Sequence, residues 1–384
     1  LWNDQRTASD AEELEARLGG VEATVAATGN RMLTGFTAPK LAWMARCEPE
    51  LHRQIRSVLL PKDYVRLRLC GEHAIDVVDA SGTGWFDVAA RSWSAAPAAV
   101  DADWLPEVME CGAISGRTPD GVPVAAGAGD QGAGALGVGA VDEGGPASVV
   151  LGTSGVVCAP AGAFAADPLG RLQASCHVVP DGWFLMGVML SAAGSLAWLA
   201  SVVGAGEPVL VEEAAGWEPG VEGLTFLPYL SGERAPHLDP AARGAFAGLS
   251  IRHDRGALAR AVLEGVAFGL RDSLDLVRET GVEVRSARLS GGGVRSWLWS
   301  EIVASVLGVP LEVVEVPEAA AYGAALLGGV AAGVWESAGV AADACIRPVA
   351  VVSPRTEWVE RYAELHRRYR ALYPPLRDWQ EESA

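Results

Sequence analysis

One carboxylate in this sequence stands where an enzyme can use it as a base. Asp130 follows the apolar residues 122–126 and the glycine-rich residues 127–129, and small residues at 133–138 come after it. The apolar run is typical of the end of a buried strand and the small residues favour a helix, so Asp130 is predicted at a strand-to-helix junction. A carboxylate there can accept the proton of a substrate hydroxyl, the role that phosphoryl transfer to an alcohol requires. The alternative is an ordinary Asp N-cap in a glycine-rich turn.

A second peptide, framed by glycine residues, is suited to binding phosphate. Gly152, Thr153 and Ser154 follow the predicted strand 147–151 and form the middle of an expected hairpin turn. Glycine lets the backbone approach a ligand closely, successive N–H groups bind an anion, and the two hydroxyls add donors. A plain β-turn is the alternative for any single peptide of this kind.

A third glycine cluster, at residues 290–296, has the order of a nucleotide site. It follows a predicted strand that ends at Leu289, contains Gly292 and Gly293, and leads into a helix at Ser296. Such a loop admits a nucleotide, and the helix N-terminus favours negative charge. The cluster is neither a G-x-G-x-x-G nor a Walker sequence. The three loops together, more than any one of them, therefore predict a cleft between two domains.

The loop at residues 226–237 carries charge but is predicted to be structural. Glu233 and Arg234 are expected to pair with each other or with backbone groups, and a substrate role is the minor alternative. His237 has no Cys or His at metal-ligand spacing, so it is expected to be a loop histidine and no metal ligand is assigned.

The composition argues against several classes of partner. The 384 residues carry 48 acidic and 30 basic side chains, a net charge of -18, which argues against binding to nucleic acid or to an anionic membrane. A small-molecule substrate and a soluble cytoplasmic protein are expected instead. The cysteines have no C-x-x-C spacing and no neighbouring His cluster, so reduced, mostly buried thiols are expected. They are Cys47, Cys70, Cys111, Cys158, Cys176 and Cys345.

Two uncharged stretches, residues 182–206 and 319–335, are long enough to be considered as membrane spans. Gly, Ala and Ser dilute both, and the first divides into a strand-like and a helix-like half, so both are predicted to be core elements of an α/β protein. The chain opens without a basic flank that leads into an apolar run, so no signal peptide is expected. It does not begin with Met, which we interpret as the start of a fragment or a processed chain.

The order of elements predicts an α/β protein. Amphipathic helices at 10–26 and 38–58 precede the strand at 122–126, which is expected to belong to a parallel sheet. Acid, glycine and proline at 142–146 mark a domain boundary. Beyond it strands alternate with helices, which implies a partly parallel sheet. The strands are predicted at 147–151, 155–158, 183–190, 286–289 and 311–314, and the helices at 255–280, 296–307, 319–335 and 356–373, with a frayed tail at 377–384.

Several segments resemble the FGGY family of carbohydrate kinases, and among them the xylulokinases. Residues 35–43 are similar to the first signature of the family and residues 244–264 to the second, although Ala257 stands where the second expects a polar residue. Residues 59–67 and 79–88 resemble xylulokinases rather than glycerol kinases. The resemblance covers nearly the whole chain.

The resemblance implies an actin-like fold, in which two α/β domains of the ribonuclease H type close on a cleft. It places the remainder of a sugar-binding N-terminal domain at residues 1–143, an ATP-binding C-terminal domain at 144–375 and a tail at 376–384. It also implies ATP and Mg2+ as cofactors and a sugar as substrate, with no nucleic acid or membrane partner. A homodimer is considered as the oligomer.

The resemblance also implies roles for individual residues. Asp130 matches the general base that accepts the proton of the sugar hydroxyl, and Gln131 matches a neighbour that contacts the sugar. The matches to nucleotide-binding residues are Gly152, Thr153 and Ser154 at the phosphates and Gly292, Gly293 and Ser296 at the adenosine.

One part of the family pattern is absent from this sequence. Family members begin with an Asp-x-Gly-Thr-x-Ser hairpin and a Gln-Met-His segment, whereas residues 1–6 resemble a Trp-x-Asp-x-Arg segment that follows both. The first domain is therefore expected to be incomplete, with an exposed sheet edge. The leading hypothesis is ATP-dependent phosphorylation of a ketose, from D-xylulose to D-xylulose 5-phosphate. The alternatives are a catalytically inactive nucleotide-binding fragment or pseudokinase, and a sugar-responsive transcription regulator, which the charge disfavours.

Overall fold

The structure, a computed structural model, describes residues 4–94, 100–316 and 318–383. Residues 1–3 of the opening segment and residue 384 of the tail lie outside the described residues. The chain divides into two compact units, each assembled from three stretches, so the continuous domain limits given above stay a prediction. The first unit contains Leu1–Gly145, Pro160–Leu185 and Glu318–Ile346, and the second contains Pro146–Ala159, Met186–Pro317 and Arg347–Ala384.

Short helices form the beginning of the first unit. The helix predicted over 10–26 is wrong as one element, because Gly19 and Gly20, with φ of 100° and 94°, separate two helices. The helix predicted over 38–58 is also wrong as one element, since Pro49 starts a separate short helix. The helices are α1 (Ala8–Arg17), α2 (Val21–Thr28), α3 (Thr37–Cys47), α4 (Pro49–His52), α5 (Pro61–Cys70), α6 (Val77–Ser81) and, much later in the chain, α13 (Ala338–Cys345).

The strands at the start of the first unit are short. β1 (Ala74–Asp76) pairs in parallel with β4 (Glu107–Met109). β5 (Ile114–Arg117) and β6 (Pro123–Ala125) form an antiparallel hairpin. The expectation that residues 122–126 belong to a parallel sheet is therefore wrong, because a connection as short as this one allows only antiparallel pairing. The remaining pair is β2 (Phe86–Asp87) with β3 (Ser92–Trp93), and a 3-10 helix covers Ala102–Trp104.

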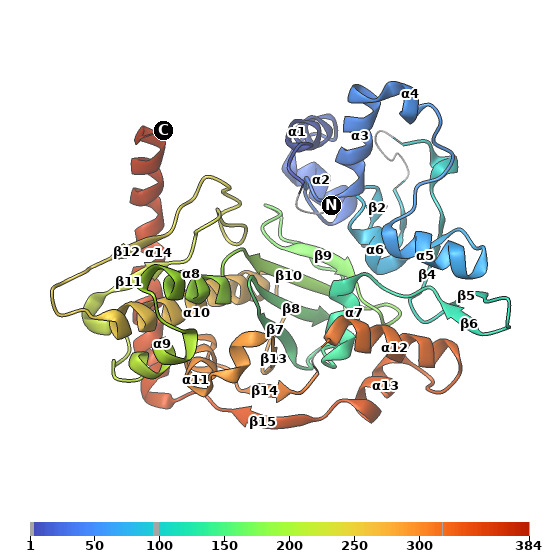
Figure 1. Cartoon of the computed structure of the whole chain (residues 1–384). Coiled ribbons are helices and arrows are strands. Elements are labelled where there is room, and N and C mark those ends of the chain that lie inside the picture. Colours follow the sequence, from blue (N-terminus) through green and yellow to red (C-terminus); the bar gives the residue numbers. More distant parts are fainter. Residues whose placement is uncertain (1–3, 95–99, 317, 384) are drawn as a thin grey trace. The chain divides into compact units, whose positions relative to one another are not determined.

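The predicted base, Asp130, lies on one of two packed helices that are rich in small residues. α7 (Asp130–Gly137) packs along α12 (Ala319–Ala331), as Figure 1 shows. A Cβ atom on Gly137 would stand 1.9 Å from the carbonyl oxygen of Ala319, and Gly323 makes an equally close approach to α7. The two backbones are therefore in direct contact, and a side chain at either glycine would push the helices apart.

A seven-stranded mixed sheet provides the strand ends at which two of the glycine loops lie. Its order is β15-β14-β13-β7-β8-β10-β9. β13 pairs in parallel with β7 and β14, whereas the β7–β8 and β14–β15 pairs are antiparallel, which confirms a partly parallel sheet. The strands are β7 (Ala147–Leu151), β8 (Gly155–Ala161), β9 (Gln173–Cys176), β10 (Trp183–Met189), β13 (Ala287–Ser290), β14 (Leu311–Val314) and β15 (Pro348–Val352).

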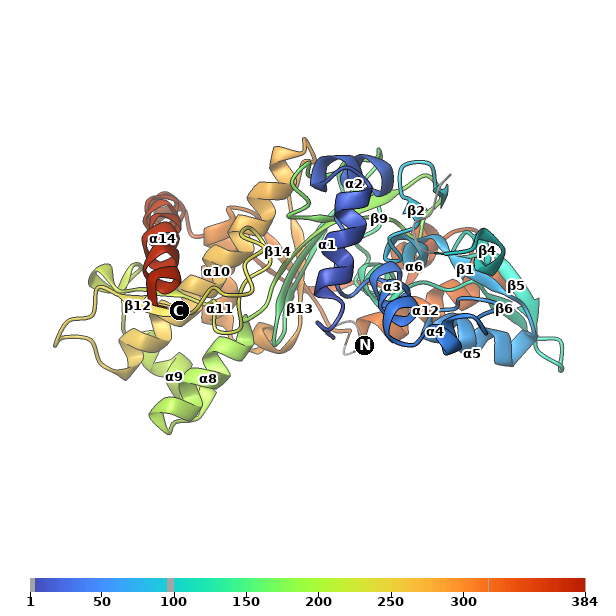
Figure 2. The same ribbon diagram turned by 90° about the horizontal axis from the view of Figure 1, so that it is seen from above.

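Longer helices belong to the second unit. α10 (Arg255–Glu279) begins after Asp254, whose side chain accepts a backbone hydrogen bond from the first turn. Figure 2 shows α10 beside α11 (Trp297–Leu307), and both match the helices predicted there. The other elements are α8 (Ala193–Val203), α9 (Glu207–Ala214), α14 (Thr356–Ser383), the strand pair β11 (Thr225–Leu227) and β12 (Ala245–Ala247), and the 3-10 helices Val221–Gly223 and Gly292–Arg295.

The C-terminal residues are helical. The expectation of a frayed tail at 377–384 is wrong for residues 377–383, which continue α14. These residues contain no glycine or proline, and the Arg, Gln and Glu residues among them favour helix. The adjacent Pro374 and Pro375 lie inside the helix without ending it.

All six cysteines are free, and Cys111, Cys158 and Cys176 are buried. Burial raises the pKa of the Cys176 thiol to about 11, so this thiol is protonated at neutral pH. The expectation of free thiols is confirmed, while the expectation that most are buried holds for half of them.

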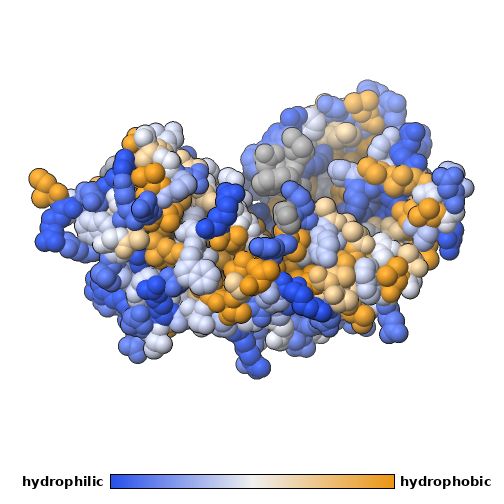
Figure 3. All heavy atoms as spheres, turned by 60° about the horizontal axis from the view of Figure 1, so that its bottom comes forward, coloured by the Kyte–Doolittle hydropathy of each residue, from blue (hydrophilic) through white to orange (hydrophobic). Residues whose placement is uncertain are grey.

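The stretches considered as membrane spans fold as predicted for core elements. Residues 182–206 contain β10 and α8, and α12 begins the second stretch. Within the described ranges, no single helix is long and apolar enough to cross a membrane, and only the pair Ala193–Val203 and Glu207–Ala214, bent by 98°, passes that test together. On the face drawn in Figure 3, hydrophobic residues lie in several groups among hydrophilic ones.

Candidate active site

Asp130 lies in the first turn of α7, at the predicted strand-to-helix junction. Gly129 is the N-cap of this helix, so the alternative of an ordinary Asp N-cap is wrong. Asp130 and Gln131 are both exposed. Among the described residues one hydrogen bond reaches the Asp130 carboxylate, from the Gln131 amide, whose Nε2 lies 3.4 Å from Oδ2. The carboxylate is therefore accessible to a substrate, and the helix N-terminus favours its negative charge.

A group of charges lies behind the residues that precede Asp130. The ammonium of Lys62, on α5, lies 2.6 Å from Asp63 Oδ1 and 2.7 Å from Asp76 Oδ2. It lies 3.4 Å from Asp79 Oδ2 and donates to the carbonyl of Ala126 at 3.3 Å. Burial acts to lower the pKa of Lys62, but the three carboxylates outweigh burial and raise that pKa above its usual value. Lys62 is therefore a fixed positive charge.

The other members of this group are held by their own elements. Asp76 ends β1 and caps α6, since its Oδ1 accepts two N–H groups at 2.9 and 3.0 Å. Arg66 pairs with Asp63 at 3.2 Å and donates to the Ala126 carbonyl at 2.7 Å. Burial, with the neighbouring carboxylates, raises the pKa of Asp79 to about 7. We call these five side chains the Lys62 cluster: Lys62, Asp63, Arg66, Asp76 and Asp79.

No motif in the sequence predicts the Lys62 cluster, because its members come from three separate elements. A weaker signal was present: Lys62 and Asp63 fall within residues 59–67, and Asp79 begins residues 79–88. These are the two segments that resemble xylulokinases. The resemblance marked both segments without indicating that they meet.

The Lys62 cluster does not fit a metal ion. Ligand oxygens of Asp63, Asp76 and Asp79 lie within 4.8 Å of one another, and no other such group occurs among the described residues. Lys62 already places its ammonium against all three carboxylates, at the distances given above. The ammonium therefore takes the place that a divalent cation would need.

The predicted phosphate turn is the hairpin between β7 and β8. Its backbone is closed by the Gly152 N–H, which donates to the Ser154 carbonyl at 3.1 Å. Residues at the start of α8 support it: the Ala193 N–H donates to Gly152 and the Ala192 N–H to Thr153, both at 2.8 Å. The Thr153 side chain is exposed. The turn is therefore fixed by backbone hydrogen bonds while its hydroxyl remains accessible.

The third glycine cluster, at residues 290–296, packs against β7, the strand that leads into this turn. Gly291 has a φ of 95°, and a Cβ atom there would stand 2.7 Å from the carbonyl oxygen of Leu151. A Cβ atom on the buried Gly293 would stand 2.3 Å from Cδ2 of the same leucine. At Gly292 the nearest atom is the flexible end of Arg295, at 3.5 Å. The packing therefore requires glycine at 291 and 293 but leaves room at 292.

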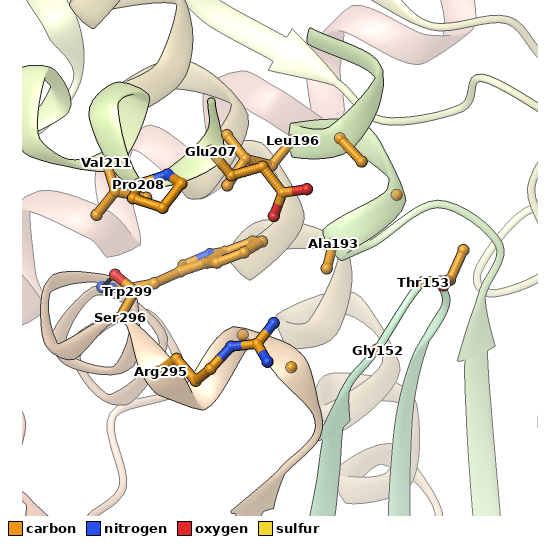
Figure 4. A pocket seen from close by; sticks show the side chains of 14 residues that line it. Gly152, Thr153, Ala193, Leu196, Glu207, Pro208, Val211, Arg295, Ser296 and Trp299 are labelled. Carbon is orange, nitrogen blue, oxygen red and sulfur yellow. Dashed lines mark hydrogen bonds between the residues drawn. The ribbon is translucent and has the colours of Figure 1, made fainter. Parts of the chain in front are cut away.

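The two loops line one cavity of about 860 Å³ within the second unit, a volume that suits a nucleotide. Figure 4 shows Glu207 and Arg295 extending into it from opposite sides. Sequence reasoning missed Glu207, Pro208 and Trp299, because single side chains on α9 and α11 form no motif. It assigned no role to Arg295, which lies within the glycine cluster at residues 290–296. Of the six predicted nucleotide residues, Ser154 does not line the cavity and five do: Gly152, Thr153, Gly292, Gly293 and Ser296.

The charged loop that precedes β12 is held by its own hydrogen bonds. Glu233 Oε1 accepts the N–H of Leu190 at 3.0 Å and that of Arg234 at 2.7 Å, which confirms the expected pairing with backbone groups for Glu233. Burial raises the pKa of Glu233 to about 8. His237 shares a hydrogen bond of 3.1 Å with the Tyr229 hydroxyl, so its ring is held within the loop.

Comparison with known proteins identifies the family. Residues 1–137 match the N-terminal domain of the FGGY family of carbohydrate kinases, and residues 147–332 match its C-terminal domain. A protein of Escherichia coli (strain K12) named xylulose kinase is 46% identical over 325 residues, which are 81% of this chain. The match spans 66% of that relative's own length.

Solved structures with the same fold include kinases of known family. A crystal structure named as a xyloylose kinase from Brucella ovis matches with a TM-score of 0.93 and 41% identity, over 99% of this chain and 80% of that one. A xylulose kinase from Rhodospirillum rubrum matches with a TM-score of 0.90 and 30% identity, over 98% and 79%. The predicted two-domain α/β sugar kinase fold is confirmed. The chain belongs to the FGGY family of carbohydrate kinases.

Proposed function

We propose that the protein phosphorylates a ketose with ATP, converting D-xylulose to D-xylulose 5-phosphate. The observation that carries the proposal is the accessible Asp130 carboxylate in the first turn of α7, in a chain of this kinase family. Relatives named as xylulose kinases favour D-xylulose among the ketoses.

In this reaction Asp130 is the general base. It accepts the proton of the terminal sugar hydroxyl while that oxygen forms a bond to the γ-phosphorus of ATP. The bond between the γ-phosphorus and the bridging oxygen breaks, and its electron pair leaves with ADP. The exposed Gln131 amide lies beside Asp130 and orients a neighbouring hydroxyl of the sugar.

The cavity of the second unit is proposed to bind ATP. Its volume fits a nucleotide, and the turn at Gly152 and Thr153 offers backbone and hydroxyl groups to the phosphates. The Arg295 guanidinium extends into the cavity and adds positive charge (Figure 4). The adenosine would lie along Gly292, Gly293 and Ser296.

Mg2+ is proposed to arrive bound to the phosphates of ATP. This ion usually keeps several water molecules and binds proteins through one or two carboxylates together with substrate phosphates. The Lys62 cluster does not fit it, as shown above, and no step of the mechanism depends on a site for it in the described residues. When bound, the ion would neutralise charge on the phosphates.

Release of ADP, measured in a coupled assay with the full-length protein, tests the proposed substrate. We expect the kcat/KM for D-xylulose to exceed that for glycerol by at least about 100-fold, because sites that hydrogen-bond several hydroxyls reject substrates that lack them. D-ribulose and L-ribulose complete the comparison. Equal activity toward glycerol and the ketoses would overturn the assignment of a ketose.

A nucleotide-binding pseudokinase is the second candidate. The observation in its favour is that every residue lining the cavity belongs to the second unit, whereas Asp130 belongs to the first. Isothermal titration with ATP distinguishes the two: binding of ATP without ketose-dependent release of ADP supports the pseudokinase. The cytoplasmic location and the homodimer stay predictions.

A further inference from the structure

The glycine residues that precede Asp130 rest on two charged side chains. A Cβ atom on Gly129 would stand 2.6 Å from Oδ1 of Asp79, and one on Gly127 would stand 3.4 Å from Cδ of Lys62. The Asp79 carboxylate in turn lies 3.4 Å from the Lys62 ammonium. Gly127 and Gly129 therefore pack against this ion pair, directly before the base.

The chain is fixed as far as Gly127 by hydrogen bonds. The Ala126 carbonyl accepts from Lys62 at 3.3 Å and from Arg66 at 2.7 Å. The Gly127 N–H donates to the Cys111 carbonyl at 3.0 Å. Lys62 thus holds both the end of the β6 segment and the carboxylate on which Gly129 rests.

Gly129 joins this anchor to the base. Glycine has access to more backbone conformations than any other residue, and here it is the N-cap of α7. The side chain closest to the free side of Gly129 is that of Asp79. A shift of Gly129 would move the Asp130 carboxylate, and a misplacement of about 1 Å can cost roughly 100-fold in rate.

We propose that Asp79, held by Lys62, is a positioning residue that fixes Gly129 and so directs the Asp130 carboxylate toward the sugar hydroxyl. The proposal rests on the proposed role of Asp130 as the base. Asp79 acts through the backbone of its neighbour rather than by touching the reacting atoms. Its contribution should therefore exist only while Asp130 is able to accept a proton.

The charges of the cluster make the proposal testable without unfolding the protein. Three carboxylates face two cations, Lys62 and Arg66. Neutralising Asp79 leaves two of each, so the change relieves repulsion among the carboxylates while it removes the attraction of Asp79 for Lys62. Asp79→Asn keeps the shape of the side chain, and Asp79→Ala removes its contact with Gly129 as well.

The experiment compares Asp79→Asn and Asp79→Ala in the full-length protein with a control, Asp103→Asn, which removes an exposed carboxylate of the same unit. We expect kcat to fall roughly 10- to 100-fold in both Asp79 variants with the KM for ATP within about twofold, and no change in the control. Hydrogen exchange of the amides of residues 127–132 should become faster in both Asp79 variants, and that of α10 should not.

A double-mutant cycle separates positioning from other roles. In the Asp130→Asn background, adding Asp79→Asn should lower kcat by less than about twofold if Asp79 acts only through Asp130. A full additional loss would overturn the proposal, since Asp79 would then act on the substrate or on the fold. Unchanged kcat and unchanged exchange in both Asp79 variants would also overturn it. Normal turnover of Asp130→Asn alone would instead defeat the proposed base, while the exchange of residues 127–132 would still report whether Asp79 holds Gly129.

Discussion

The two candidate binding regions of this protein depend on different kinds of interaction. In the first unit an exposed carboxylate, Asp130, follows the glycine residues that pack against the partly buried Lys62 cluster. In the second unit the cavity is formed by glycine loops whose shape is set by backbone contacts, such as that of Gly291 with Leu151. The first region should therefore be sensitive to changes of charge and the second to changes of volume.

The difference has a chemical basis in the proposed reaction. A base must hold one oxygen in one direction, which a rigid network of charges behind it can provide. Phosphates are large anions with many acceptor oxygens, and they are bound best by several N–H groups that a close-packed glycine turn exposes. Loss of function caused by a change of volume in the first region, or by a change of charge in the second, would contradict this contrast.

The largest effect is expected for Asp130→Asn. The variant keeps the size of the side chain and its hydrogen bond with Gln131 but can no longer accept a proton, so kcat should fall roughly 100- to 10,000-fold. The Kd for ATP, measured by isothermal titration, should stay within about threefold, because the second unit alone lines the nucleotide cavity. Near-normal turnover would remove Asp130 from the role of base.

The glycine loops and Asp130 could be predicted from the sequence, whereas the Lys62 cluster could not. The difference has a physical reason. The glycine loops and Asp130 are local: each lies within a few residues of a strand end, so its neighbours along the chain predict its position. The Lys62 cluster depends on α5, β1 and α6 meeting in space, and the direction of β6 depends on its partner strand. Neither can be inferred from the apolar pattern of one segment.

The next effect should come from volume in the second unit. Gly293→Ala would place a Cβ atom 2.3 Å from Leu151, so the loop must move, and we expect the Kd for ATP to rise roughly tenfold or more. Gly328→Ala is the matched control, because Gly328 does not line the cavity and a Cβ atom there would meet nothing within 4 Å. Titration of both variants checks the prediction. Equal affinities would show that the packing of this loop does not shape the cavity.

A smaller change is expected at Gln131. Gln131→Asn shortens the side chain by one methylene and moves its amide by about 1.5 Å, which alters a hydroxyl contact without touching the base. The ratio of kcat/KM values among ketoses should change by no more than about tenfold. Assays with D-xylulose, D-ribulose and L-ribulose measure that ratio. Complete loss of activity would mean that Gln131 does more than orient the sugar.

The last prediction concerns stability rather than activity, and it compares how the two units respond to pH. Glu233 has a pKa of about 8 in the folded protein against an ordinary value of 4.5, so the stability associated with its neutral form is fully present below about pH 4.5 and is lost as the pH rises through 8. Glu233→Gln keeps an acceptor for the two N–H groups that Oε1 binds and removes the titration. The free energy of unfolding of the unmodified protein, relative to this variant, should therefore fall between pH 5 and pH 8.

The corresponding difference for Asp79→Asn should fall as the pH rises from about 4 to about 7, because the pKa of Asp79 in the folded protein is about 7 and its ordinary value is 3.8. Its loss should be complete near pH 7, while that of Glu233 continues to pH 8. Urea unfolding at several pH values, followed through hydrogen exchange of peptides from each unit, separates the two. Identical profiles for both variants would mean that the two carboxyls share one environment, although Asp79 lies beside the Lys62 ammonium and Glu233 accepts two backbone N–H groups.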